Sequence, residues 1–369
     1  MTEQAKVPAI RFAGFTDPWE QRKLGELTES YSGGTPAAGE SEFYGGSIPF
    51  IRSAEIAAES TELFLTEKGY ESSSARMVKP GDVLYALYGA TSGEVAVSRQ
   101  KGAINQAILA ILPRDDCDAR YITAWLRKQK GYIVTTYLQG GQGNLSGVIV
   151  KNLEVSIPSL PEQQKIGFML SHLDSLITLH QRKYDKLVIF KKSMLEKMFP
   201  KDGESVPEIR FAGFTDPWEQ RKFSEIVDVC SGRDYKQLDG GPIPVYGTGG
   251  YMTSVSEALS HNRDAIGIGR KGTIDKPYLL KAPFWTVDTL FYAIPKSDIN
   301  LEFALCSFSN VDWKSKDEST GLPSLSKESI NETVLSVPNV VEQNHLGSFF
   351  ADLDRLITLH QRKRLWFAK

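Results

Sequence analysis

The chain has 369 residues, of which 41% are hydrophobic, 24% charged and 10% aromatic, and its formal net charge at pH 7 is −2. This composition is typical of a globular protein that is long enough for two domains with separate cores, and it argues against a disordered or fibrous chain. The nearly neutral balance neither indicates nor excludes a nucleic-acid partner, because a basic face can be balanced by acidic residues elsewhere.

The cysteines and the N-terminus bear on the cellular compartment. Cys117, Cys230 and Cys306 are isolated and odd in number, and none forms a CxxC or a His/Cys spacing typical of metal sites. We therefore expect neither a disulfide framework nor a metal. The N-terminus lacks an apolar signal segment, and no run of about 18 uncharged apolar residues occurs in the sequence. A cytoplasmic protein with no membrane segment is expected.

Two stretches each occur twice with one difference. The first, here called the frame segment, begins at Val7 and again at Val206, and it ends with Trp-Glu-Gln-Arg-Lys both times. The second, Leu173 to Lys183, recurs at Leu353 to Lys363. Between the repeats the sequence diverges. A repeat of this length sets the architecture, and it predicts one scaffold that presents two different modules.

The first module follows the first frame segment. Residues 48–52, 82–88 and 107–112 are rich in β-branched and aromatic residues between Gly and Pro, which predicts short strands. Residues 119–130 have a helical pattern, and 139–144 form a glycine-rich loop. The module is therefore predicted to be mixed α/β.

A long helix is predicted from Pro161 to Phe199, because Gly167 is the one helix breaker in this range. Its apolar residues fall into heptads that are typical of a helix packed on another helix. The stripe comprises Ile166, Met169, Leu170, Leu173, Leu176, Ile177, Tyr184, Leu187, Phe190, Met194 and Met198. His180 and Lys183 interrupt the stripe, which indicates a polar layer there. Pro200 ends the helix, and 201–205 form a polar linker.

The second module repeats this order. Residues 244–246, 265–269 and 286–294 are predicted strands, and a second helical stripe follows at Leu346, Phe349, Leu353 and Leu356. The two stripes predict that the helices pair. The second helix runs only six residues past Lys363, whereas the first runs about 16 residues past Lys183.

The order of these segments resembles the specificity subunit of type I restriction–modification enzymes. Trp19 to Leu24, repeated at Trp218 to Phe223, is similar to the opening of each target-recognition domain of that family. Ile157 to Ile166 is similar to the junction between module and helix, and Val337 to Gln343 repeats it more loosely. The segments Leu173 to Lys183 and Leu353 to Lys363 resemble the conserved helices. In the second module, Tyr246–Tyr251, Ile268–Gly272 and Phe284–Leu290 are similar to one recurrent type of recognition domain.

The resemblance implies an α+β fold in which two globular mixed α/β target-recognition domains are separated by two long antiparallel conserved helices, with a pseudo-twofold internal repeat. It places the first target-recognition domain at 1–158 and the central helix at 159–200. The linker and second domain occupy 201–338, and a short C-terminal helix occupies 339–369.

The resemblance also implies a function. Each recognition domain would read one half of a bipartite site in double-stranded DNA, and the helices would set the spacer and dock two methylation subunits. Motor–nuclease subunits would complete the complex. This chain would be non-catalytic and hold no cofactor, whereas its partners would use S-adenosylmethionine, ATP and Mg. The alternative is a two-module scaffold that binds protein or another ligand and has no DNA role.

Polar residues in turns are the candidate DNA contacts, because small and hydrogen-bonding side chains allow close approach to phosphates and base edges. These candidates are Thr35, Arg52, Ser53, Tyr88, Gln142, Asn144, Tyr246, Thr248, Arg270, Lys271 and Ser324. For about half of these loops, ordinary surface turns explain the composition equally well. Gly267 to Gly272 also matches GxGxxG, but Pro277 argues against the helix that a dinucleotide site needs.

Candidate contacts with partner subunits lie on the helices: Leu173, Leu176, Ile177, His180, Leu353, Leu356, Ile357 and His360. Packing between the helices explains the same stripe without a partner. The basic residues from Arg182 to Lys197 form either a solvated helix face or a contact with spacer phosphates. Asp17-Pro18-Trp19 is better explained as a turn than as a methyltransferase motif, and the dipeptide Gly-Lys of a nucleotide-binding P-loop never occurs.

Overall fold

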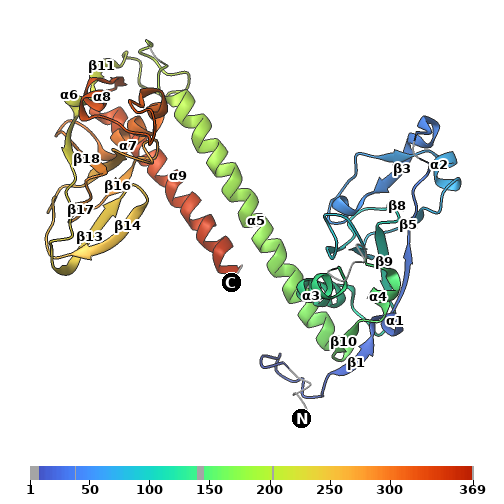
Figure 1. The fold of residues 1–369 in the computed structure, drawn as a ribbon. Helices are drawn as coiled ribbons and strands as arrows, with labels where there is room; N and C mark the ends of the chain where they lie inside the picture. Colours follow the sequence, from blue (N-terminus) through green and yellow to red (C-terminus); the bar gives the residue numbers. More distant parts are fainter. Residues whose placement is uncertain (1–7, 38, 139–144, 202, 368–369) are drawn as a thin grey trace. The chain divides into compact units, whose positions relative to one another are not determined.

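The computed structural model describes residues 8–37, 39–138, 145–201 and 203–367, and it divides into two compact units, Met1–Leu176 and Ile177–Lys369. Figure 1 shows the elements of each unit. The division falls inside the long helix α5 (Leu160–Met198), whereas the sequence placed domain boundaries at the ends of that helix.

Unit 1 contains two four-stranded sheets and one separate strand pair. The first sheet has the order β2-β9-β6-β7 and is antiparallel throughout. The second has the order β4-β3-β8-β5, in which β3 and β8 run parallel. The strands are β1 (Glu20–Lys23), β2 (Thr28–Ser32), β3 (Tyr44–Ile51), β4 (Phe64–Leu65), β5 (Arg76–Val78), β6 (Val83–Ala86), β7 (Val95–Val97), β8 (Gly102–Ile104), β9 (Ile108–Pro113) and β10 (Glu154–Ile157).

Strand β6 explains how unit 1 is layered. All four of its residues are buried, because alternate side chains point into two different cores. Val83 and Tyr85 pack towards helix α3 (Ala119–Leu138), whereas Leu84 and Ala86 pack towards the second sheet. Unit 1 is therefore a helix layer on a sheet on a second sheet. Its shorter helices are α1 (Leu24–Leu27), α2 (Glu67–Glu71), α4 (Gly147–Lys151) and the 3-10 turns η1 (Ser41–Phe43) and η2 (Ser53–Glu55).

Unit 2 repeats this plan. One sheet has the order β12-β18-β15-β16, and the other has the order β14-β13-β17 with β13 and β17 parallel. The strands are β11 (Glu219–Lys222), β12 (Val227–Ser231), β13 (Gly240–Gly247), β14 (Gly250–Val255), β15 (Ala265–Gly269), β16 (Tyr278–Leu280), β17 (Trp285–Thr286), β18 (Leu290–Pro295) and β19 (Val334–Val337). The helices are α6 (Phe223–Ile226), α7 (Leu301–Asn310), η3 (Trp313–Lys316), α8 (Lys327–Glu332) and α9 (Val340–Phe367).

Most of the predicted elements are confirmed, although β3 and β13 begin four residues earlier than predicted and β6 ends two residues earlier, and two differences are larger. The predicted strand 286–294 is two strands, because residues 287–289 form a turn between β17 and β18. The helix predicted at 119–130 continues to Leu138. Helix α5 matches its prediction to within one residue at each end.

The frame segment makes the same contacts in both units, and this shared structural role explains why the sequence repeats it. Its last four residues form β1 and β11, which pair antiparallel with the strands that precede the long helices, β10 and β19. Upstream, Arg11 donates to both carboxylate oxygens of Glu162 at 2.6 and 2.7 Å, and Arg210 donates to Glu342 at 2.7 and 2.8 Å. Both glutamates are almost fully buried at the start of their helices. Each frame segment is thus clamped onto a helix N-terminus.

Within unit 2, the end of α5 packs antiparallel on α9. His180 contacts His360, whereas Lys191, further along α5, contacts Asp354, which is earlier in α9, at 2.6 Å. Leu187, Met194 and Leu195 line the unit 2 core, which also contains Leu346, Phe350 and Leu353. The predicted pairing of the two helices is confirmed for this part of α5.

Candidate nucleic-acid interface

Strands β3 and β8 run parallel, so both end at the same end of unit 1, and other loops meet them there. Residues 104–107, which join β8 to β9, hold three other loops by backbone hydrogen bonds. Gly34 N–H donates to Ile104 O at 3.1 Å, and Leu87 N–H donates to Ala107 O at 2.8 Å. Asn105 N–H donates to the last residue of β3, Ile51, at 3.4 Å. The loops after β2, β3 and β6 therefore share one surface, here called loop surface 1 (residues 33–37, 52–56, 87–92 and 104–107).

Unit 2 has the same arrangement around residues 286–290. Arg233 N–H donates to Thr286 O at 2.9 Å, Val287 N–H donates to Tyr246 O at 3.0 Å, and Arg270 N–H donates to Thr289 O at 2.8 Å. The loops after β12, β13 and β15 thus converge, and the loop before α8 joins them because Leu325 N–H donates to Arg270 O. We call this loop surface 2 (residues 232–235, 247–252, 270–273, 286–290 and 317–327).

Arg270 and Lys271 are both exposed on loop surface 2. The Arg270 guanidinium lies 5.7 Å from the centroid of the Phe291 ring and donates weakly to Asp288 O at 3.4 Å. A guanidinium held against a ring keeps its outer donors available for a base edge or a phosphate. Both residues line a hollow of about 350 Å³ with Ser324, Ser326 and Lys327.

Glycines make this turn possible. A Cβ on Gly269 would lie 1.9 Å from Thr273 O, and Gly272 has a φ of +92°. Gly269 is therefore required because the backbone of Thr273 lies too close for a side chain, and Gly272 is favoured because its conformation is left-handed. After the turn the chain enters strand β16 instead of a helix, so Gly267 to Gly272 lacks the helix N-terminus that a dinucleotide site requires.

The remaining candidates of unit 2, Tyr246, Thr248 and Ser324, are each half-buried. Ser324 forms an isolated bridge with Lys271, and its N–H donates to Asp317 Oδ1 at 2.9 Å, so this carboxylate orders the loop. Thr248 lies in the turn between β13 and β14. The Tyr246 ring is half-buried between Tyr251 and Tyr278, which makes it a support for the surface.

In unit 1 the candidates Thr35, Arg52, Ser53 and Tyr88 all lie on loop surface 1. Thr35 Oγ1 contacts Gln106 Oε1. Arg52 is exposed, but its Nη2 and Nε donate to Glu55 at 2.6 and 3.1 Å, and this contact holds the pKa of Glu55 below its usual value. Burial raises the pKa of the half-buried Tyr88. Gln142 and Asn144 lie outside the described residues.

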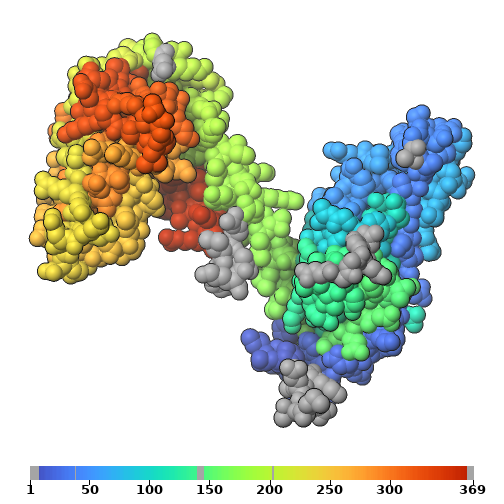
Figure 2. Space-filling model, in the orientation of Figure 1, coloured from blue at the N-terminus to red at the C-terminus, as the bar shows by residue number. Residues whose placement is uncertain are grey.

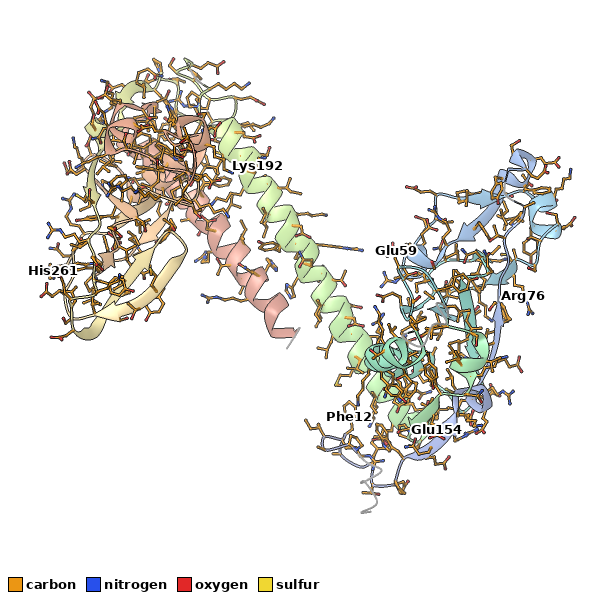
Figure 3. The ribbon with its side chains drawn as sticks, in the orientation of Figure 1. Phe12, Glu59, Arg76, Glu154, Lys192 and His261 are labelled. Carbon is orange, nitrogen blue, oxygen red and sulfur yellow. The ribbon has the colours of Figure 1, made fainter. Side chains whose placement is uncertain are left out.

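Sequence reasoning missed Arg76, which begins β5 (Figure 3). Its register partner is Ile104, so it belongs to the same end of unit 1. The exposed guanidinium lies 4.0 Å from the centroid of the Tyr31 ring, and Tyr31 Oη donates to Met77 O. No local pattern marks this arginine, because its place depends on the pairing of β5 with β8.

The helix candidates differ in exposure, and two of them are paired histidines. Leu353 is 6% exposed in the core of unit 2, whereas Leu356 is 40% exposed, and Leu173, Leu176, Ile177 and Ile357 are half-buried. His180 and His360 contact each other, with their Nδ1 atoms 2.8 Å apart. Burial, followed by the charges of nearby His and Lys residues, lowers the pKa of His360. The polar layer that the sequence indicated is this histidine pair.

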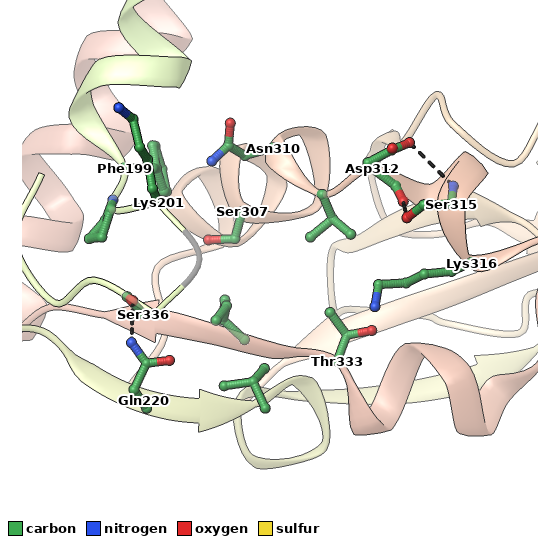
Figure 4. A pocket seen from close by; sticks show the side chains of 15 residues that line it. Phe199, Lys201, Gln220, Ser307, Asn310, Asp312, Ser315, Lys316, Thr333 and Ser336 are labelled. Carbon is green, nitrogen blue, oxygen red and sulfur yellow. Dashed lines mark hydrogen bonds between the residues drawn. The ribbon is translucent and has the colours of Figure 1, made fainter.

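The cysteines, Trp19 and a polar hollow in unit 2 are not part of either loop surface. The three cysteines are free, and the described residues contain no cluster of three or more side chains suited to a metal. Trp19 packs edge-on against Tyr121, as expected for a chain-entry turn. A polar hollow of about 470 Å³ in unit 2 is lined by the frame strand and the linker, and Gln220 donates to Ser336 there at 2.7 Å (Figure 4). Its lining includes none of the candidate residues.

Comparison with known proteins gives the family. The family model described as "Type I restriction modification DNA specificity domain" matches the chain twice, at residues 16–188 and 215–365. The chain belongs to this family. Each specificity domain covers one module and much of the helix that follows it.

Two curated relatives and one solved structure are similar to the chain. The MjaIX specificity subunit of Methanocaldococcus jannaschii is 29% identical over 60% of this chain and 54% of its own length. The EcoR124I/EcoR124II specificity subunit of Escherichia coli is 25% identical over 45% of this chain and 46% of its own length. The chain thus spans about half the length of the curated relatives it matches. The solved S subunit from M. genitalium shares the fold, with a TM-score of 0.66, 17% identity and coverage of 99% of this chain and 96% of that one.

None of the described helices is both long enough and apolar enough to cross a membrane.

Proposed function

We propose that this chain is the DNA-reading subunit of a type I restriction–modification complex and that each specificity domain reads one half of a split site. The observation that carries the proposal is the equivalent convergence of loops in the two units. Loop surfaces 1 and 2 are built by the same backbone hydrogen bonds, yet they display different side chains. One scaffold with two different surfaces is what an asymmetric bipartite target requires.

The side chains suit DNA. Arg76 and Arg270 each lie over an aromatic ring and keep donors for guanine O6 and N7 or for phosphate. Thr35, Ser324 and Lys271 add smaller polar contacts. Arg52 contributes through its remaining N–H donors, because the pair with Glu55 uses Nε and Nη2 and a guanidinium carries five donors.

The helices supply the second part of the proposal. They set the spacing between the half-sites and dock two methylation subunits, and motor–nuclease subunits join that assembly in the cytoplasm. Exposed apolar residues on α5 and α9 support docking: Phe168, Met169, Leu179, Val188, Ile189, Leu356 and Leu359 are each at least 40% exposed. S-adenosylmethionine, ATP and Mg belong to those partners, and this chain contributes recognition without catalysis.

The alternative is a two-module scaffold that binds protein or another ligand. The exposed arginines supported by rings favour DNA, because a guanidinium fork matches guanine edges and phosphates. Single-molecule methylome sequencing of cells with and without this gene decides between them. We expect a split adenine-methylated motif that disappears with the gene. An unchanged methylome, in cells that express the methylation subunit, would refute the DNA-reading function.

A further inference from the structure

Three large apolar side chains are exposed on loop surface 2. Tyr251 is 64% exposed, Met252 52% and Leu322 66%. Single exposed apolar residues are ordinary, but a group around one basic turn is typical of a binding surface. Leu322 precedes Pro323, whose carbonyl accepts from Gly272 N–H at 2.8 Å, so it adjoins the Arg270–Lys271 turn.

Tyr251 and Met252 stand at the turn of the β13–β14 hairpin, which forms part of the surface of unit 2 (yellow in Figure 2). In the ladder Tyr251 pairs with Tyr246, and Gly250 pairs with Gly247. Tyr246 O accepts from Val287 N–H, and Thr289, two residues on, accepts from Arg270 N–H. The exposed hairpin residues and the basic turn are therefore both fixed to the segment 286–290.

Both side chains are held in place. The Tyr251 ring lies edge-on to Tyr246, with centroids 6.4 Å apart, and its hydroxyl is 3.1 Å from Ser254 Oγ. Met252 covers Gly247, because a Cβ built there would lie 2.6 Å from Met252 Sδ. Side chains that are ordered before binding lose little conformational entropy when they bind.

Unit 1 differs at this position, because its strands β3 and β4 also pair antiparallel but are joined by the longer connection 52–63. Strand β13 turns back as β14, whereas β3 runs into the 3-10 turn η2, in which Arg52 pairs with Glu55. Loop surface 2 therefore presents exposed apolar side chains beside its basic turn, whereas loop surface 1 presents the ion pair of Arg52 with Glu55.

We infer that Tyr251 and Met252 form an apolar wedge that presses on a base step of the second half-site, while Arg270 and Lys271 hold the adjacent backbone and base edge. This inference rests on the proposed DNA-reading function. Apolar side chains that enter a base step unstack it partly, and the lysines and arginines beside them supply the charge complementarity that a duplex requires. We expect the distortion in the second half-site, because the tight β13–β14 turn that carries Tyr251 and Met252 belongs to unit 2.

The test uses the complete complex with its methylation subunits and a duplex that contains the mapped target. Permanganate footprinting reports unstacked thymines, and 2-aminopurine at each adenine that is not methylated reports unstacked purines. We expect one reactive step in the second half-site. The double variant Y251A/M252A should lose that signal and weaken specific binding about five- to hundredfold, the range of one base-stacking contact.

Tyr132→Ala is the matched control, because Tyr132 is 62% exposed on α3 of unit 1. It should leave affinity and both signals unchanged. Specific binding without any unstacked step in the second half-site, or unchanged affinity in the double variant, would overturn the wedge. Loss of a methylation subunit from the double variant with DNA binding intact would make the hairpin a protein-docking surface and would also overturn it. If the wild-type complex shows no preference for its target, the DNA-reading function itself fails.

Discussion

Arg270 illustrates how far a single residue could be interpreted from the sequence. Its glycine-flanked position predicted an exposed turn, and the structure confirms this. A side chain on Gly269 would clash with Thr273, and Gly272 has a φ of +92°. Arg76 could not be found in this way, because strand pairing, which is non-local, places it beside Ile104 of loop surface 1. The pairing of Arg52 with Glu55 was also missed, although a spacing of three residues permits it.

Arg270→Ala should weaken specific binding by about 1–3 kcal/mol and relax the choice of base at one position of the second half-site, because a bidentate contact with guanine is lost. Competition binding with single-base target variants measures this. A uniform loss across all sequences with a shallower salt dependence would instead identify a phosphate contact. Arg263→Ala is the control, since Arg263 donates to Pro295 O at the opposite end of β15.

His360 gives the stability of the helix pair a pH dependence. Its folded-state pKa lies below the ordinary value of 6.5, mainly because of burial, so the unfolded chain binds the proton first as the pH falls. Stability should be full above about pH 6.5 and should decrease from there down to the folded-state pKa. Thermal unfolding from pH 8 to 5.5 should show a smaller decrease for His360→Asn. Identical pH profiles for the two proteins would contradict this role.

At the scale of elements, periodicity and breakers located the long helices well, because α5 has a heptad stripe and Pro200 follows it. The short strands β1, β10, β11 and β19 were not predicted. Strands β1 and β11 share the pattern Glu-Gln-Arg-Lys, which carries no apolar alternation, and β10 and β19 have only four residues each. The four strands form because β1 pairs with β10 and β11 pairs with β19, which are contacts between distant parts of the sequence. The duplication of the frame segment was the available signal, and it pointed to a shared structural role.

The clamp between frame and helix should be essential for stability. Arg210→Met leaves Glu342, which is 1% exposed, without its guanidinium, and removing one partner of a buried pair costs about 3–5 kcal/mol. Chemical denaturation should show this loss, and Arg11→Met should act similarly through Glu162. The double variant R210M/E342L should recover much of it, because it leaves no unpaired buried charge. A single variant as stable as wild type would show that the clamp contributes little.

The helix pair should also act as a ruler. Inserting four residues near Tyr184 adds about 6 Å, a little more than one turn, and roughly preserves the apolar stripe. Because one base-pair step is about 3.4 Å, the unread gap between the half-sites should lengthen by one or two base pairs while both half-sites stay the same. Methylation mapping of the insertion variant measures the gap. Full activity with an unchanged gap would mean that the helices do not set the spacing.

For the whole molecule, the repeat predicted the architecture before any element was assigned. Two units with the same layers, the same frame clamp and the same convergence of loops follow from one duplicated scaffold. The surfaces could not be predicted in the same way. The hairpin turn at Tyr251 and the pair of Arg52 with Glu55 depend on the divergent inserts, where the two modules share no pattern.

Exchange of one module tests the central claim most directly. Residues 28–155 are replaced by the corresponding module of another member of the family, and the methylome of cells with the chimera is compared with that of the parent. The account predicts a split motif in which one half is new and the other half is unchanged. A motif altered in both halves, or left unaltered in a chimera that still supports methylation, would contradict the claim that each specificity domain reads its own half-site.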